Sequence, residues 1–172
     1  MHFEFLKRYA PPGMELRSEL VCFIVGICAS FFYSMSFLIN YFQHRDNLFD
    51  TNETGKLIEG AVMEDFYVLL GFDGKYEQVF IGFLITAIVM LGFTILHYSY
   101  YRQGSKSIYL MKRLPHPAEI HKRALILPFA AVLCCVIAAF LVMVLYFAIY
   151  VLATPTVCLQ PAQWSKLWGN LL

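Results

Sequence analysis

Hydrophobic residues along this chain are gathered into three long blocks and do not alternate with polar residues. The blocks that contain no Asp, Glu, Lys or Arg are 20–44, 78–101 and 124–165. A hydrocarbon core of about 30 Å is crossed by about 20 helical residues, and each block exceeds that length. Strands of a membrane barrel would instead alternate apolar and polar positions. The pattern therefore predicts three transmembrane helices, at 20–42, 79–101 and 125–152.

The first block is too long to be the apolar core of a cleaved signal peptide. Such a core has about 7–15 residues. The predicted helix at 20–42 is longer, and it follows a polar segment that covers residues 1–19. We therefore interpret the first block as an uncleaved membrane anchor.

The charges between the blocks predict which side of the membrane each loop occupies. The loop 102–124 carries six basic residues and one acid, whereas the loop 43–78 carries three basic residues and eight acids. Short loops rich in Lys and Arg stay in the cytoplasm. We therefore expect a multi-pass protein of the cell inner (plasma) membrane. Its segments 1–19 and 102–124 are expected to be cytoplasmic, and its segments 43–78 and 153–172 extracytoplasmic.

Three shorter segments outside the blocks repeat apolar residues at helical spacing. Within 1–19 the repeat predicts a cytoplasmic interfacial helix, with a frayed tail as the alternative. In the outer loop it predicts an amphipathic helix from Leu57 to Leu69 that stops at Gly71. In the tail it predicts an interfacial helix over 162–172, because Trp164 and Trp168 share one face and Trp favours the membrane interface.

Composition supports a membrane protein over the soluble classes. Hydrophobic residues make up 59% of the chain and charged residues 15%, against about 45–50% and about 25% in soluble domains. These values exclude a disordered protein, a collagen-like protein and an ordinary soluble enzyme. The formal net charge of +1 provides no field that would attract nucleic acid. We therefore expect membrane lipid as a partner, and no nucleic acid.

The chain contains no motif that predicts a catalytic, cofactor or metal site. The acidic run from Asp50 has Ala61 where a calcium loop needs a bidentate Glu. Gly55-Lys56 lacks the other residues of a phosphate-binding loop. The candidate metal ligands of the inner loop do not share one helical face, and they are His116, Glu119 and His121.

His97 is the one ionisable side chain inside a predicted span, apart from Tyr and Cys. Such residues are functional candidates, but His97 is close to the inner end of its span, and we interpret it as a neutral, hydrogen-bonded histidine. No Asp, Glu, Lys or Arg is expected to be buried. This expectation argues against proton-coupled transport and against an intramembrane hydrolase, which needs a general base.

The cytoplasmic loop is predicted to contain a short amphipathic helix. Gly104 interrupts the preceding span, Ser105 can cap the new helix, and Leu114-Pro115 ends it. Its apolar residues are Ile108, Tyr109, Leu110, Met111 and Leu114, and its basic residues are Lys106, Lys112 and Arg113. Physical reasoning leaves two positions open for such a helix: on anionic lipid, or in a groove of a soluble partner.

The sequence S-K-S-I-Y-L-M-K-R-L-P, placed between two spans, resembles the membrane subunits of bacterial ABC exporters, in particular permeases of the type II exporter superfamily. In that family this loop carries a coupling helix, usually followed by a Leu-Pro pair, which sits in a cleft of the cytosolic ATPase. The N-terminal segment is similar to the connecting helix of those permeases. The resemblance implies ATPase coupling by Ser105, Lys106, Ile108, Tyr109, Leu110, Met111 and Arg113.

The resemblance also implies the partners of the chain. Such permeases have six spans, so three predicted spans imply a half-size or degenerate subunit, completed by another membrane subunit or by a second copy of itself. ATP would be hydrolysed by a separate cytosolic ATPase subunit, so this chain is expected to be no enzyme and to need no cofactor. Two alternatives remain open: a non-transporting membrane scaffold or regulatory accessory subunit, and a membrane enzyme.

Overall fold

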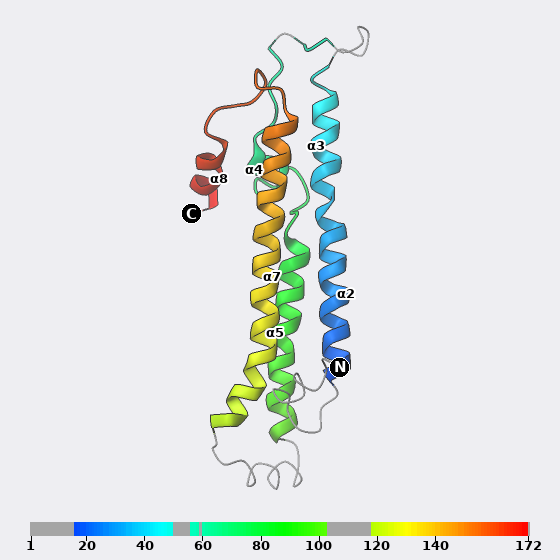
Figure 1. Ribbon diagram of the computed structural model, residues 1–172, viewed down its shortest axis with the longest axis vertical. Helices are drawn as coiled ribbons and strands as arrows, with labels where there is room; N and C mark the ends of the chain where they lie inside the picture. The colour runs from blue at the N-terminus through cyan, green and yellow to red at the C-terminus, as the bar shows by residue number, and fades with distance from the viewer. Residues whose placement is uncertain (1–15, 50–55, 59, 103–117, 172) are drawn as a thin grey trace. The chain divides into compact units, whose positions relative to one another are not determined.

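The computed structural model describes residues 16–49, 56–58, 60–102 and 118–171, and these are mostly helical. The helices are α2 (Leu16–Ser34), α3 (Ser36–Asp46), α4 (Phe66–Leu69), α5 (Ile81–Arg102), α7 (Ala118–Ala153) and α8 (Gln163–Leu171), as Figure 1 shows. Within the described residues, β-pairing is limited to an isolated bridge between Phe49 and Leu57. The predicted helical fold class is confirmed. The helices predicted near the N-terminus and in the inner loop lie outside the described residues.

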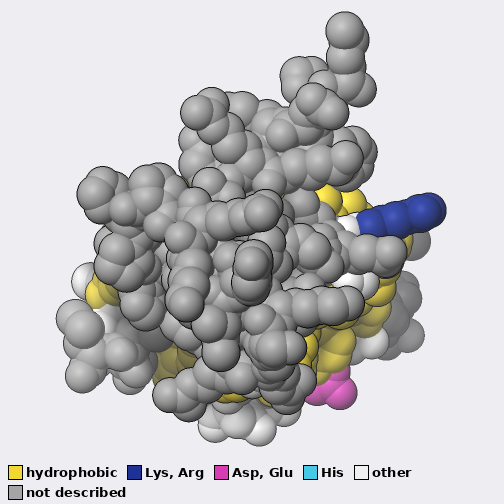
Figure 2. Space-filling view, turned by 90° about the horizontal axis from the view of Figure 1, so that it is seen from below, with side chains coloured by type: hydrophobic (Ala, Val, Ile, Leu, Met, Phe, Trp, Pro, Cys, Tyr) yellow, Lys and Arg dark blue, Asp and Glu magenta, His cyan; other side chains and the backbone are white. Residues whose placement is uncertain are grey.

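Two helical segments are long and apolar enough to cross a membrane, by length and composition. They are Arg17–Asp46, formed by α2 and α3, and Leu125–Ala153 in α7. Only 17% and 22% of their most apolar windows are buried inside the chain. The apolar side chains of both segments therefore face mainly outward, unlike those of a core helix in a soluble protein. In the end-on view of Figure 2, the described side chains that are visible beside the grey atoms are mostly hydrophobic.

Helix α7 begins before the predicted third span and contains a proline. It starts at Ala118, whereas the predicted span starts at residue 125. Pro128 has no N–H for the carbonyl of the preceding turn, and a proline inside a helix bends it. Figure 1 shows α7 bending near its N-terminal end.

The described chain divides into two compact units. The first unit combines residues up to Ala29 with Gly82–Ala138, and the second combines Ser30–Ile81 with Ala139–Leu172. Within the first unit, α2 approaches α5 closely at Gly26. A Cβ atom on Gly26 would lie 2.8 Å from Cγ2 of Thr86 and 2.9 Å from its Oγ1. Small residues allow helices in membranes to come this close.

We expect Gly26→Ala to lower the free energy of unfolding by about 1–3 kcal/mol, because the added methyl group overpacks the contact with Thr86. Adding Thr86→Ala should recover part of this loss. Gly92→Ala is the matched control, since nothing lies within 4 Å of the Cβ it would add. The free energy of unfolding is measured in mixed micelles for the wild-type chain, the two single variants and the double variant. Equal losses for Gly26→Ala and Gly92→Ala would contradict the close contact.

The second unit is held together by a cluster of aromatic rings. Phe37 of α3 stacks on Tyr146 of α7, with ring centroids 4.6 Å apart. Phe66 of α4 packs edge-on against Phe37 at 5.6 Å, and its ring centroid lies 5.5 Å from that of Tyr150. Each such pair contributes about 0.5–1.5 kcal/mol beyond the area it buries. These rings connect the segment between α3 and α5 to both long helical segments within the unit.

The predicted amphipathic helix over 57–69 is wrong for most of its length, because only Phe66–Leu69 is helical. The backbone N–H groups before it bond elsewhere: Ile58 N–H donates to Leu48 O at 3.0 Å, and Met63 N–H donates to Cys158 O at 3.0 Å. Gly60 also has a φ of +81°, which a helix does not accept. The predicted stop is confirmed, since Gly71 follows α4 with a φ of +83°.

The predicted C-terminal helix is confirmed as α8, Gln163–Leu171. Leu167 on its apolar face is fully buried, whereas Trp164 and Trp168 are 39% and 40% exposed. The Trp164 ring packs against Phe147 of α7 with centroids 4.9 Å apart. Leu167 therefore fixes α8 to its own unit, and the two Trp rings remain available to the surroundings.

Candidate functional site

A carboxylate and an imidazole meet in the interior of the first unit. Oε2 of Glu19, in the first turn of α2, lies 3.3 Å from Nε2 of His97 in α5. The two side chains are only 5% and 2% exposed. Burying a charge is costly unless it is paired.

The second carboxylate oxygen of Glu19 makes this site unusual. Oε1 is buried and has no hydrogen-bond partner among the residues that the structure describes. Most buried polar atoms are paired, so each exception calls for an explanation. Glu19 also lines a cavity of about 160 Å³, whose other walls are apolar. A cavity with mostly apolar walls and a polar residue at its edge resembles the sites in which proteins hold small molecules.

This pair corrects one expectation. Glu19 was expected to precede the first span and no acidic residue to be buried, yet Glu19 is 4% exposed. His97 was expected to be a neutral, hydrogen-bonded histidine, and the structure places the Glu19 carboxylate beside its ring. The spacing of residues in α2 does indicate that Glu19 lies on a face that packs against another helix. Residues at three- and four-residue intervals share one helical face, and the face that begins at Glu19 continues through Phe23 to the small residues Gly26 and Ser30.

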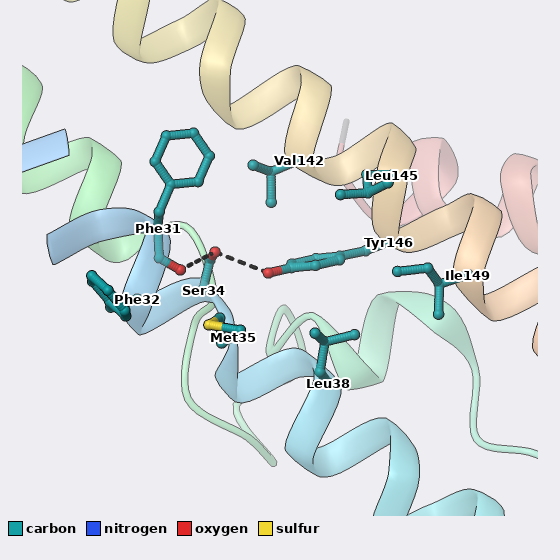
Figure 3. A pocket seen from close by; sticks show the side chains of 9 residues that line it. All are labelled: Phe31, Phe32, Ser34, Met35, Leu38, Val142, Leu145, Tyr146 and Ile149. Atoms are coloured by element: carbon teal, nitrogen blue, oxygen red, sulfur yellow. Dashed lines mark hydrogen bonds between the residues drawn. The ribbon is translucent and has the colours of Figure 1, made fainter. Parts of the chain in front are cut away.

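The second unit contains an apolar groove of about 290 Å³, drawn in Figure 3. Tyr146 of α7 reaches toward Ser34 of α2, and the two hydroxyls are 3.0 Å apart. The Ser34 hydroxyl also donates to Phe31 O at 2.8 Å. Nearby, the hydroxyls of Tyr41 and Thr154 are 3.1 Å apart. These hydroxyls satisfy one another, so we interpret them as packing contacts of the bundle.

A polar network joins α8 to the start of α4 in the second unit. Gln163 Nε2 donates to Asp65 Oδ1 at 2.7 Å, and Gln163 Oε1 accepts from Phe66 N–H at 2.9 Å. Lys166 Nζ lies 3.0 Å from Asp65 Oδ1. On the surface, the hydrogen bond from Lys75 to Glu64 raises the pKa of Lys75 above its ordinary value. These contacts are structural, because each polar group has a protein partner.

The residues predicted to couple to an ATPase lie within 103–117, outside the described residues. They are Ser105, Lys106, Ile108, Tyr109, Leu110, Met111 and Arg113. His116 lies in the same segment, whereas Glu119 and His121 belong to the first turns of α7. Within the described part of the chain, no group of three or more His, Cys, Asp or Glu is placed to hold a metal ion.

No family model, curated protein or solved structure matches the chain. Functional inference therefore depends on the residues themselves. The pair of Glu19 and His97, with its cavity, is the candidate site of the described residues.

Proposed function

We propose that this chain is a transmembrane subunit of an ABC-type export complex, in which a separate ATPase chain hydrolyses ATP. One observation carries the proposal: the segment S-K-S-I-Y-L-M-K-R-L-P occupies the connection between two apolar helices. Helix α5 ends at Arg102 and helix α7 begins at Ala118. A coupling helix needs this placement, because force on it has to reach helices in the membrane.

We include α5 as a third span. Its 22 residues correspond to about 33 Å at about 1.5 Å per residue, against a hydrocarbon core of about 30 Å. Arg102, at its last position, is its only Asp, Glu, Lys or Arg. Three spans place the two ends of the chain on opposite sides of the membrane. The basic loop is then cytoplasmic by the positive-inside rule, in a bacterial inner membrane.

Coupling in this proposal is a change of helix positions driven by the ATPase. Ile108, Tyr109, Leu110 and Met111 would fill an apolar cleft of the ATPase, while Lys106 and Arg113 would pair with charges at its rim. ATP binding shifts the complex between conformations only if the two conformations hold this loop differently. The outward apolar surfaces of the spans suit a second copy or another membrane subunit, since three helices are few to enclose a substrate path.

The test is co-purification of the tagged full chain from native membranes. Changing Ile108, Tyr109 and Met111 together to Asp is expected to reduce recovery of a nucleotide-binding chain by at least about 10-fold, because three charges would enter an apolar contact. Gln103→Asp is the matched control, since it adds negative charge to the same loop outside the docking residues. It should leave recovery unchanged.

Two results would contradict the proposal. The first is a triple variant that folds and retains its nucleotide-binding partner, which would place the contact elsewhere. Alternatively, a membrane-impermeant amine reagent applied to intact cells could modify Lys112 and leave Lys75 unmodified, which would invert the topology. If the chain is deleted and ATP turnover of the complex stays the same, a non-transporting accessory subunit is the better description.

A further inference from the structure

Helix α8 packs against the C-terminal part of α7 within the second unit. The centroid of the Trp164 ring lies 4.9 Å from that of Phe147, and Leu167 is fully buried. The chain reverses after α7, so that α8 lies beside the C-terminal part of that helix in Figure 1. The position of Phe147 along α7 therefore also gives the position of the Trp164 ring.

The length of α7 gives the depth of Phe147 in a membrane. The apolar segment Leu125–Ala153 has 29 residues, which correspond to about 44 Å at about 1.5 Å per residue. A bilayer measures about 40–45 Å with its headgroups and about 30 Å without them, so each headgroup layer takes about 5–8 Å. Phe147 lies six residues before Ala153, or about 9 Å inside that end of the segment. Phe147 is therefore close to the boundary between headgroups and acyl chains.

The surface that α8 leaves uncovered at this depth is amphipathic and uncharged. Within the described part of α8, the exposed residues are Trp164, Ser165, Trp168 and Gly169. The two Trp side chains are 39% and 40% exposed. An indole ring has an apolar body and a polar N–H, so it suits the boundary between headgroups and acyl chains.

Lys166 is the only charged residue within Gln163–Leu171, and its ammonium group contacts the protein. Nζ lies 3.0 Å from Asp65 Oδ1, and it donates to Gln160 Oε1 at 2.6 Å. Interfacial helices that bind anionic lipid instead present Lys and Arg on their polar face. Helix α8 uses its lysine to hold Asp65, so its contact with lipid has to come from the two Trp rings.

We propose that α8 anchors the second unit at the boundary between headgroups and acyl chains, by inserting the indole rings of Trp164 and Trp168. The partner is the uncharged part of a phospholipid layer, so insertion does not depend on lipid charge. On its other side, α8 is held to the start of α4 through Asp65. This inference rests on the proposed span Leu125–Ala153. It does not depend on coupling to an ATPase, nor on which side of the membrane α8 occupies.

The test is quenching of intrinsic fluorescence, because Trp164 and Trp168 are the two tryptophans of the chain. The full chain is reconstituted in phosphatidylcholine vesicles that carry bromine either near the headgroup end or near the methyl end of the acyl chains. Trp164→Phe and Trp168→Phe each keep one reporter. Both should lose more fluorescence with the shallow bromine than with the deep one. Adding anionic lipid or salt should leave this loss unchanged, because the inserted rings carry no charge.

Two control variants move the reporter, each in a chain whose Trp164 and Trp168 are both replaced by Phe. Leu141→Trp places it near the middle of Leu125–Ala153, at a residue that is 62% exposed, and it should lose more fluorescence with the deep bromine. Gly169→Trp places it about 100° around α8 from Trp168, where nothing lies within 4 Å of an added Cβ. This reporter should be quenched more by aqueous iodide than Trp168 is.

Failure of the span and failure of the anchor give different results. If the deep bromine does not quench the Leu141→Trp chain, Leu125–Ala153 does not cross the membrane, and the proposed function fails together with this inference. If that control behaves as expected but brominated lipid does not quench the native tryptophans, this inference alone is overturned. Stronger quenching of the native tryptophans by the deep bromine, or quenching that requires anionic lipid, also overturns it.

Discussion

His97→Leu is expected to lower the free energy of unfolding by about 3–5 kcal/mol, because it leaves the Glu19 carboxylate buried without its partner. Glu19 and His97 are 4% and 1% exposed, so water cannot replace the lost contact. Oε1 has no hydrogen-bond partner within the described part of the chain, and the substitution would leave Oε2 without His97 as well. The measurement is unfolding of the purified chain in mixed micelles of mild and denaturing detergent.

The double variant Glu19→Met/His97→Leu shows whether the charge causes the loss. Replacing both partners with apolar groups removes the uncompensated charge, and such replacements are often nearly neutral. The double variant should therefore be more stable than His97→Leu alone. If removing the carboxylate destabilises the His97→Leu chain further, Glu19 stabilises the fold by packing rather than through its pairing with His97.

Gly71→Ala is expected to lower the free energy of unfolding by about 3 kcal/mol or more. Gly71 follows α4 with a φ of +83°, and a left-handed conformation costs residues with a side chain about 1–2 kcal/mol. The added Cβ would also lie 2.5 Å from Glu77 O and 2.8 Å from Tyr76 O. Both are backbone atoms, so they cannot move aside as the end of a flexible side chain would. The outer loop would have to shift.

Gly74→Ala is the control for Gly71→Ala, because it isolates the backbone contribution. Gly74 has a φ of +79°, close to that of Gly71, but nothing lies within 4 Å of the Cβ that it would gain. We expect Gly74→Ala to lower the free energy of unfolding by about 1–2 kcal/mol. Thermal unfolding compares the two chains. If both variants lose the same stability, the close approach to residues 76 and 77 has no energetic consequence.

The long helices were predictable because they depend on residues close together in the chain. The uncharged blocks predict apolar helices, and the structure has such segments at Arg17–Asp46, Ile81–His97 and Leu125–Ala153. Helix α8 followed from the spacing of Trp164, Leu167 and Trp168, which places them on one face of a helix. The end of α4 followed from Gly71, since few other residues adopt its conformation.

The outer loop was predicted wrongly because its apolar spacing is compatible with more than one backbone. Ile58 and Val62 are four residues apart, as on one face of a helix, but the N–H groups of Ile58 and Met63 donate to the carbonyls of Leu48 and Cys158. The Cys158 carbonyl is far from Met63 in the sequence. Helical periodicity in the loop contained no information about this competing hydrogen bond.

Glu19 was assigned to the wrong environment for a related reason. It immediately precedes the uncharged block, and a charged residue at such a boundary normally reaches water. Its position on the same face as Gly26 and Ser30 was visible in the sequence, but the partner on that face was not. His97 lies in another helix, and only the packing of α2 on α5 brings the two side chains to 3.3 Å.

Residue order alone thus accounts for where apolar helices form, where α4 stops and which loop is basic, because these properties depend on neighbours within a few turns. The buried pair of Glu19 and His97, the cavity beside it and the irregular outer loop required the folded chain. All three features depend on contacts between residues that are far apart in the sequence. Such residues interact only after folding brings them within the range of a hydrogen bond or an ion pair.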